Sequence, residues 1–554
     1  MRLRVLLLLA LFACAPGDRS GSAAAGDTGG TVIIAMPAEP QTLLPPLVRL
    51  TQEKQVIDQI FDVLAEIGPG LNTFGDAGFT PRLARSWTWS ADSLTIAFHI
   101  DPRARWHDGR PVSAGDVRFS LELYQDPVVG SHLADVLSVV DSVSVPDSLT
   151  AVAWFARRGP EQFYAVAHNL TILPEHLLRG ADRTNLRESA FSRNPVGSGP
   201  FRFVRWEARS AIELAADTAW YLGRPRLDRL IWTLGGGLAT ALSNVIVGDA
   251  DVLETLTPDA MAQVSASQIA RPVAFPGMTY GYLGFNLWDP RDPSRPHSLF
   301  SDRDVRVAIS MALDRQAMLS NVFDSLAYPA FGPFTRTIPT SDTTIVPFAH
   351  DSAGAARLLA SAGWRDTDGD GIRDRSGRPL RFGLLVPAQS APRRQYAELV
   401  QALLRPHGVQ VDVEAVDAQF GPRLLSGQFD AVINAWLIDP APSAIKGTWY
   451  SRPSTQRGMN LQGYGNLAFD ASLDSAAAEV NPARARELYR RAYRVLVADA
   501  PAVWLYESRT FVAVNRRVRT AGDSADTWWR FLRLWWIPGD ERISRDLPPS
   551  ATSR

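Results

Sequence analysis

The densest run of residues able to do chemistry is acidic. Its carboxylates stand at alternating positions and are followed by glycine, an arrangement whose oxygen atoms can wrap a hard cation such as calcium. The residues concerned are Asp366, Asp368, Asp370 and Asp374. A calcium loop also needs a glutamate at its twelfth position, where this chain has Gly377. Two interpretations therefore stay open, a calcium site and a solvated acidic turn.

The patterns that mark common catalytic sites are missing. The sequence has no Gly-x-Ser-x-Gly nucleophile motif, and its eight histidines show no His-x-x-x-His spacing for zinc. The glycine run 235–237 lacks the further glycine of a dinucleotide-binding fingerprint. Nothing points to the paired carboxylates of a glycosidase. We expect no catalysis and no cofactor, and keep a secreted hydrolase as the alternative of a different class.

Charge and length narrow the class further. The 57 basic side chains nearly cancel the 58 acidic ones, so the net charge is −1 and no basic footprint for nucleic acid exists. Hydrophobic residues make up 46% and charged residues 21%, the mixture of a soluble globular protein. A chain of 554 residues exceeds the ~250–300 residues at which a single core stops growing. We therefore expect two or three lobes.

The single cysteine, Cys14, lies at the end of an apolar start. One cysteine allows no disulfide within the chain and no thiolate metal cluster. A short basic start and the apolar run 5–12 fit a signal peptide, and the ending Leu-Phe-Ala-Cys resembles a bacterial lipobox. We expect a signal peptide over 1–13, then a lipidated cysteine and a flexible tether over 14–30. The alternative is an ordinary signal peptide with an incidental cysteine.

The body of the chain alternates strand and helix patterns, which predicts the α/β class. Periods of two and runs of β-branched residues mark the strands, and apolar residues three or four apart mark the helices. We expect Asp302 to cap one helix and Gly248 to close another. Strands are predicted at 31–36, 94–100, 380–386, 409–415 and 431–436, and helices at 54–67, 116–124, 239–247, 305–319, 353–362, 393–405 and 484–499.

A series of short motifs follows these elements in a fixed order. They lie at 89–95, 106–117, 172–176, 196–201, 220–228, 285–315 and 499–506. The most specific reads Trp-His-Asp-Gly-Arg-Pro-Val-Ser-Ala-Gly-Asp-Val. Together they resemble the extracellular solute-binding proteins of the peptide- and nickel-type ABC transporters, solute-binding family 5. Ser93 departs from the pattern, since the family usually has glycine there.

The resemblance implies a two-lobed, clam-like periplasmic-binding-protein fold with an extra subdomain in the larger lobe. Lobe I would comprise 31–50, 190–276 and 508–554, the extra subdomain 51–189, and lobe II 277–507. Ligand would bind in the crevice between the lobes and be buried when the hinge closes.

Most motif residues have a structural explanation. We expect Gly197 and Gly199 to be turn residues with unusual backbone angles. We expect Trp106, His107 and Asp108 to stabilise a tight turn and not to touch ligand. These stretches identify the fold more than the site.

The resemblance also points to Asp439. In peptide-binding members of the family, an aspartate three residues after a tryptophan and before a proline-containing turn pairs with the ligand's α-ammonium. Asp439 stands three residues after Trp436 and directly before Pro440. A carboxylate sealed in a closed cleft needs such a cation, because a buried unpaired charge is costly. The alternative is that Asp439 only caps the turn.

Further candidates are weaker. Trp436 either walls the pocket or fills the core. Tyr280, Tyr282 and Asn286 lie where the chain enters the second lobe, and a strand end in a crevice is a candidate lining.

We therefore expect a monomeric, lipid-anchored, extracytoplasmic receptor that captures peptides and delivers them to an ABC permease in a bacterial membrane. The same fold could bind an oligosaccharide, since the 16 tryptophans suit sugar faces, or a metal chelate.

Overall fold

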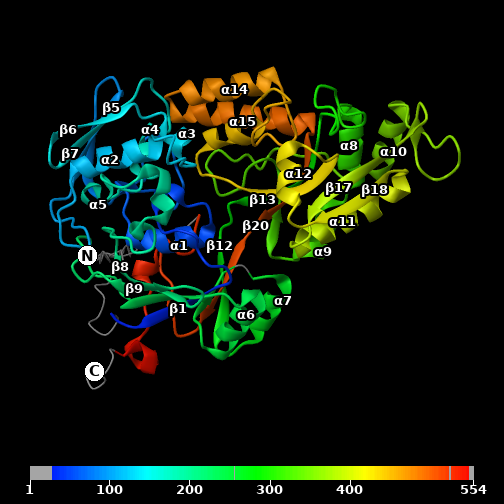
Figure 1. Cartoon of the computed structure of the whole chain (residues 1–554). Coiled ribbons are helices and arrows are strands. Elements are labelled where there is room, and N and C mark those ends of the chain that lie inside the picture. The colour runs from blue at the N-terminus through cyan, green and yellow to red at the C-terminus, as the bar shows by residue number, and fades with distance from the viewer. Residues whose placement is uncertain (1–27, 255, 523–525, 548–554) are drawn as a thin grey trace, which may run out of the picture.

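The computed structural model describes residues 28–254, 256–522 and 526–547 (Figure 1). The predicted signal peptide, Cys14 and most of the tether lie outside the described residues. Within those ranges, no helix is long and apolar enough to cross a membrane.

The first large sheet has seven strands and gathers both ends of the described chain. Strand β1 runs parallel to β10 and β11, and the other pairs are antiparallel. Every strand comes from the segments predicted for lobe I. In spatial order they are β12 (Ala270–Phe275), β21 (Thr510–Asn515), β11 (Val252–Leu253), β1 (Thr31–Met36), β10 (Arg229–Leu234), β9 (Ala211–Ala216) and β8 (Phe201–Glu207).

Three longer helices accompany this sheet: α1 (Thr51–Ile60), α6 (Gly237–Val247) and α7 (Pro258–Ala266). Gly248 closes α6 at φ +91°, as predicted. Helix α1 ends at Ile60 and not at 67. Its Gln59 Nε2 donates to the Trp529 carbonyl at 3.1 Å. This bond joins α1 to the C-terminal segment assigned to lobe I, and the domain boundary at residue 51 stays a prediction.

A four-stranded antiparallel sheet forms the extra subdomain, within the predicted range 51–189. Its strands are β4 (Ala84–Trp89), β5 (Thr95–Ile100), β7 (Thr150–Trp154) and β6 (Ser142–Asp147). Its helices are α2 (Ala114–Gln125), α3 (Ala134–Leu137), α4 (Gln162–Ala167) and α5 (Glu175–Leu178), beside a small pair, β2 (Ala65–Glu66) and β3 (Thr80–Pro81). Ser93 adopts φ +57°, the left-handed region that explains why glycine suits this turn.

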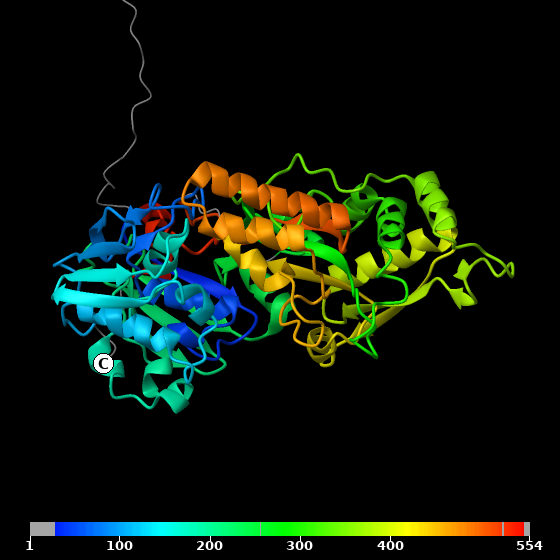
Figure 2. The ribbon, with the colours of Figure 1, turned by 90° about the horizontal axis from the view of Figure 1, so that it is seen from above.

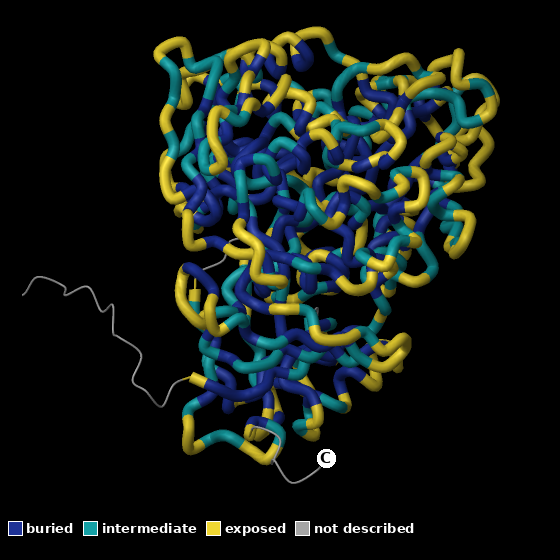
Figure 3. The backbone as a smooth tube through the Cα atoms, turned by 60° about the vertical axis from the view of Figure 1, so that its left-hand side comes forward, coloured by how far each residue is buried: buried dark blue, intermediate teal, exposed yellow. Residues whose placement is uncertain are grey.

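Lobe II is built on a six-stranded mixed sheet. In spatial order its strands are β14 (Ala327–Pro329), β20 (Ala502–Ser508), β13 (Thr279–Phe285), β19 (Ala431–Leu437), β17 (Arg381–Pro387) and β18 (Gln410–Val416). Its helices are α8 (Arg303–Ala312), α9 (Arg315–Phe323), α10 (Ser352–Ser361), α11 (Ala391–Leu404), α12 (Phe420–Ser426), α13 (Ile445–Trp449), α14 (Leu467–Ala478) and α15 (Pro482–Asp499), and a small hairpin pairs β15 (Asp374–Arg375) with β16 (Arg378–Pro379). Figure 2 shows this lobe beside the rest of the molecule, and Figure 3 shows that buried residues lie in the interior and exposed residues along the periphery.

Short 3-10 helices complete the described secondary structure. They span Pro45–Leu47, Arg183–Glu188, Ala190–Ser192, Arg405–His407, Pro442–Ala444, Leu532–Leu534, Gly539–Glu541 and Ser544–Asp546.

Two adjacent chain crossings connect the large sheets. Strand β12 leads into β13 through 276–278, and β20 leads into β21 through residue 509. A Cβ on Gly277 would lie 1.8 Å from the Ser508 carbonyl oxygen, so the crossings touch and position 277 requires glycine.

The predicted helix 305–319 is two helices. Asp302 caps α8 by accepting the Asp304 N–H at 3.0 Å, as expected. The helix ends at Ala312, and Asp314 then caps α9 by accepting the Ala317 N–H at 3.0 Å. A second capping aspartate, which the apolar period could not reveal, divides the segment.

The prediction of unusual backbone angles at Gly197 and Gly199 is wrong. Neither has a positive φ. They are glycines because the chain passes close to the end of α1, where a Cβ on Gly197 would lie 1.9 Å from the Ile60 carbonyl oxygen. His107 stabilises this turn as predicted, since its Nδ1 accepts the Gly197 N–H at 3.3 Å and its Nε2 lies 3.0 Å from the Gly199 oxygen.

A buried ion cluster fastens the C-terminal segment to lobe I. The Arg517 guanidinium contacts both oxygens of Asp251, at 3.1 and 3.0 Å, and also pairs with Asp546. It donates to the Thr31 carbonyl of β1 at 3.1 Å. The side chains of Asp251 and Asp546 are fully buried, and Arg517 compensates the charge of both, while Arg545 adds a second pair to Asp251 at 2.8 Å.

We predict that Arg517→Met lowers the free energy of unfolding by about 3–5 kcal/mol, because it leaves the buried Asp546 without its charged partner and Asp251 with Arg545 alone. Denaturant unfolding followed by circular dichroism measures the loss. The matched control is Arg381→Met, whose pair with Asp412 is exposed and should contribute less than about 1 kcal/mol. Equal losses in the two variants would contradict the prediction.

Candidate ligand-binding site

Asp439 lies where lobe II meets the extra subdomain. It lies two residues beyond the end of β19, an interior strand of the lobe II sheet. The Tyr164 hydroxyl, from α4 of the extra subdomain, donates to Asp439 Oδ1 at 3.0 Å. The Ala441 N–H donates to the same oxygen at 2.7 Å, so Asp439 also caps its own turn. The turn-capping role that the sequence left open is therefore present, and pairing with a ligand ammonium stays a prediction.

The electrostatic environment of Asp439 favours a cation. Burial raises the pKa of its carboxyl, and the charge of Asp526 adds to the effect. Among the described residues, no lysine, arginine or histidine nitrogen lies within ion-pair distance of Asp439. An ammonium group bound here would replace the lost hydration of the carboxylate.

A second carboxylate approaches the same loop. Glu161 stands just before α4, and its Oε1 accepts the Ser443 N–H at 3.4 Å across the boundary between the extra subdomain and lobe II. Burial raises the pKa of Glu161 to about 7, and the neighbouring charge of Asp439 contributes. The boundary therefore holds two carboxyl groups that repel one another when both are ionised.

A cavity of about 70 Å³ includes Asp439 in its wall. Its lining comes from Tyr280 of β13, from Pro333 and Ile338, from the segment between Trp436 and Thr448, and from Tyr493 of α15. Trp436 is half-buried, packs against the core and lines the cavity, so it does both things that the sequence allowed.

Tyr280 and Tyr282 have different surroundings. Tyr280 lines the cavity with its ring, while its hydroxyl accepts the Trp449 indole N–H at 3.1 Å. Tyr282 is fully buried in an aromatic cluster, with its ring centroid 5.9 Å from that of Trp449 and 6.2 Å from that of Trp504. The geometry supports a ligand contact for Tyr280 alone, and the contact of Tyr282 stays a prediction.

Asn286 is fully buried and holds a neighbouring loop. Its amide nitrogen donates to the carbonyls of Gly427 and Phe429 at 3.0 and 2.9 Å, and its oxygen accepts from Arg457 at 2.8 Å. These bonds occupy both ends of the side chain. They give Asn286 a structural role, and nothing in its surroundings supports the ligand contact we predicted.

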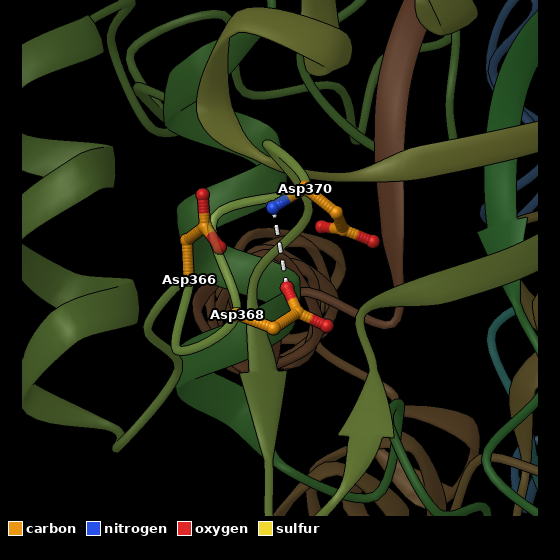
Figure 4. A group of neighbouring side chains, drawn as sticks. All are labelled: Asp366, Asp368 and Asp370. Carbon is orange, nitrogen blue, oxygen red and sulfur yellow. Dashed lines mark hydrogen bonds between the residues drawn. The ribbon is translucent and has the colours of Figure 1, made fainter.

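The acidic run forms an exposed turn (Figure 4). Carboxylate oxygens of Asp366, Asp368 and Asp370 lie within 4.8 Å of one another. Asp366 already accepts the N–H groups of glycines 369 and 371, at 2.7 and 3.0 Å. Asp374 is separate from this group and accepts from Thr367. These bonds are those of a solvated turn, and a calcium ion stays a prediction without further support.

Sequence reasoning missed Tyr164, Glu161 and Tyr493. Tyr164 and Asp439 are separated by 275 positions, and no spacing rule connects them. The available signal was weak, a polar and aromatic Glu-Gln-Phe-Tyr stretch shortly before the motif at 172–176.

The family model for the bacterial extracellular solute-binding proteins, family 5, matches residues 78–457. The chain belongs to this family. Among relatives, it is 26% identical over 554 residues to the oligopeptide-binding protein AppA of Bacillus subtilis, covering 97% of this chain and 98% of that protein.

Solved structures confirm the predicted two-lobed α/β fold. The structure of AppA from Bacillus subtilis, in complex with a nonapeptide, matches with a TM-score of 0.76 at 22% identity, over 92% of this chain and 99% of that one. NikZ from Campylobacter jejuni, in complex with Ni(L-His), also matches with a TM-score of 0.76, at 23% identity over 91% and 99% of the two chains. Because these two proteins hold different ligands, the fold alone does not select the cargo of this chain.

We predict that Glu161→Gln raises the melting temperature at pH 8 and changes it much less at pH 5. The pKa of Glu161 lies at about 7 in the folded protein against 4.5 for an ordinary glutamate, so the folded state binds this proton more tightly. The free energy of unfolding therefore falls as the pH rises from about 4.5 to about 7. Above that range, the ionised Glu161 destabilises the folded protein by about 3 kcal/mol. The amide keeps the acceptor for Ser443 without the charge.

Differential scanning calorimetry at both pH values measures the change. The matched control is Glu398→Gln on the exposed face of α11. A pH-independent shift for Glu161→Gln, equal to that of the control, would show that Glu161 is not desolvated in the folded protein.

Proposed function

We propose that this chain is the peptide-binding component of an ABC importer. The observation that carries the proposal is the Asp439 carboxylate, half-buried between lobe II and the extra subdomain with no cation in ion-pair contact among the described residues. A peptide with a free amino terminus supplies that cation. The family membership and the peptide-binding relatives support the same cargo class.

The bound ammonium would be held from both sides of the boundary. Asp439 supplies its charge from lobe II, and the Tyr164 hydroxyl contributes a polar contact from α4. Because these groups belong to different parts of the molecule, binding is coupled to their approach. Closure of this kind would bend the two touching crossings at Gly277 and Ser508, a short connection of the type that hinges use.

The fold also admits other cargoes. NikZ in complex with Ni(L-His) leaves a metal chelate as an alternative, and an oligosaccharide remains another. Neither offers Asp439 the same fixed ammonium group, so the charge of Asp439 separates a peptide from a neutral cargo. The alternative of a different class is a secreted hydrolase. A hydrolase would cleave members of a peptide or glycan library, whereas a binding protein would leave them intact.

We predict that Asp439→Asn weakens binding of a free-amine peptide at least about a hundredfold, because loss of one partner of a buried ion pair costs about 3–5 kcal/mol. N-acetylation of the peptide should weaken binding to the unchanged protein similarly. The two losses should not add, since both delete one interaction.

Titration calorimetry with free and acetylated peptide completes this double cycle. Asp412→Asn, on an exposed part of lobe II, is the matched control and should bind normally. Additive losses of binding free energy, or no loss from either change, would contradict the proposal that Asp439 binds the peptide ammonium.

We further propose that Cys14 carries a lipid that holds the protein to the outside of the cytoplasmic or another bacterial membrane, next to its permease. The support is the Leu-Phe-Ala-Cys ending of the apolar start. With a lipid the protein partitions into the detergent phase, and we predict that Cys14→Ser moves it to the aqueous phase. Phase separation followed by immunoblotting measures this, and equal partitioning of both proteins contradicts the anchor.

A further inference from the structure

The cavity beside Asp439 has apolar walls. Of its described lining residues, Asp439 alone carries a charge, and the others are aliphatic, aromatic, proline or threonine. The hydroxyl groups of the walls are already paired within the protein, while the buried indole nitrogen of Trp436 has no hydrogen-bond partner. The Tyr280 hydroxyl accepts from Trp449, the Tyr493 hydroxyl lies 3.4 Å from Thr340 Oγ1, and the Thr448 hydroxyl donates to the Ile445 carbonyl at 3.2 Å. A polar side chain entering this space would lose its hydration and find few partners.

The size of the cavity favours a small occupant. A dry cavity of roughly 150 Å³ accepts benzene. The 70 Å³ beside Asp439 is about half of that, which suits a short branched aliphatic side chain better than an aromatic one.

The rim of the cavity is also apolar and incompletely covered. Leu437 is 69% exposed although it belongs to β19, whose first four residues are buried. It lines the cavity directly beside Trp436. An apolar group seated here would remove this leucine from water, which favours binding.

We infer that this cavity receives the side chain of the ligand's first residue and selects a small aliphatic residue such as valine or leucine. The inference rests on the proposed function, since it takes the peptide ammonium to be at Asp439. The side chain branches from the carbon that carries the ammonium, so its first atom is only two bonds from the nitrogen, and the cavity that shares the Asp439 wall is the space it enters. A basic or acidic first residue would be desolvated there without a partner.

The test uses two peptide series, X-Gly-Gly and X-(Gly-Ser)₄, with glycine, valine, leucine, tryptophan, lysine or aspartate as the first residue. Calorimetry on the full chain should show valine or leucine binding at least about tenfold more tightly than glycine, with tryptophan, lysine and aspartate no better than glycine. Two lengths are included because the preferred length of the cargo is a separate property of the cleft.

Two variants test the cavity itself. Ala444→Leu places a larger side chain in the cavity wall at an exposed position, and should reduce the preference for leucine over glycine to about one. Ala471→Leu makes the same change on the exposed face of α14 and should keep the preference. Thermal melts of both variants establish that they are folded.

Each outcome of these experiments supports or contradicts the aliphatic pocket or the proposed function. If peptides bind with no dependence on the first residue, or with lysine or aspartate preferred, the aliphatic pocket is wrong and the proposed function stands. If Ala444→Leu weakens every peptide equally, the preference arises elsewhere and the pocket is again wrong. If no free-amine peptide of either series binds, the proposed function fails, and the pocket assignment fails with it.

Discussion

The site depends on one constraint, the cost of keeping a carboxylate away from water. Asp439 meets this cost with a hydroxyl from another part of the molecule and a backbone N–H from its own turn. Neither donor carries a full charge, so the carboxylate remains under-compensated and its pKa is raised. Glu161 places a second carboxyl at the same boundary and increases the deficit. A site that is poor in positive charge and partly dry is suited to a cationic group, and less to an anion or a neutral solute.

The chain passes from lobe I into lobe II and back again. Lobe I takes strands from the beginning, the middle and the end of the described sequence, and lobe II is inserted between β12 and β21. Two crossings therefore lie side by side, and their contact at Gly277 leaves no space for a side chain. The buried Arg517 cluster ties the last segment to β1 in the same lobe. Lobe I is thereby fixed internally, while its link to lobe II stays narrow, the geometry that domain closure requires.

Several motifs that identify the family make structural contacts within and between the subdomains. His107 binds the turn at Gly197 and Gly199, and that turn packs on the end of α1. Asp108 pairs with His176 at 2.7 Å, which connects two motifs separated by 68 positions. The His107 contacts join the extra subdomain to lobe I, and the Asp108–His176 pair connects two motifs within the extra subdomain. These motifs therefore stabilise the junction and the subdomain, which explains why they identify the fold.

Local sequence patterns determined the elements whose causes are local. The strand at 31–36, the cap at Asp302 and the closure of α6 at Gly248 follow from β-branched runs, a capping oxygen and a glycine free to adopt positive φ. The motif around Asp439 also indicated the candidate site. Only the tertiary structure brought Tyr164 to Asp439, revealed the apolar cavity, and showed that Gly197 is small because α1 passes beside it. Burial, pKa shifts and close backbone contacts arise where distant segments of the chain pack together. The local sequence pattern of one segment does not specify which distant segment packs against it.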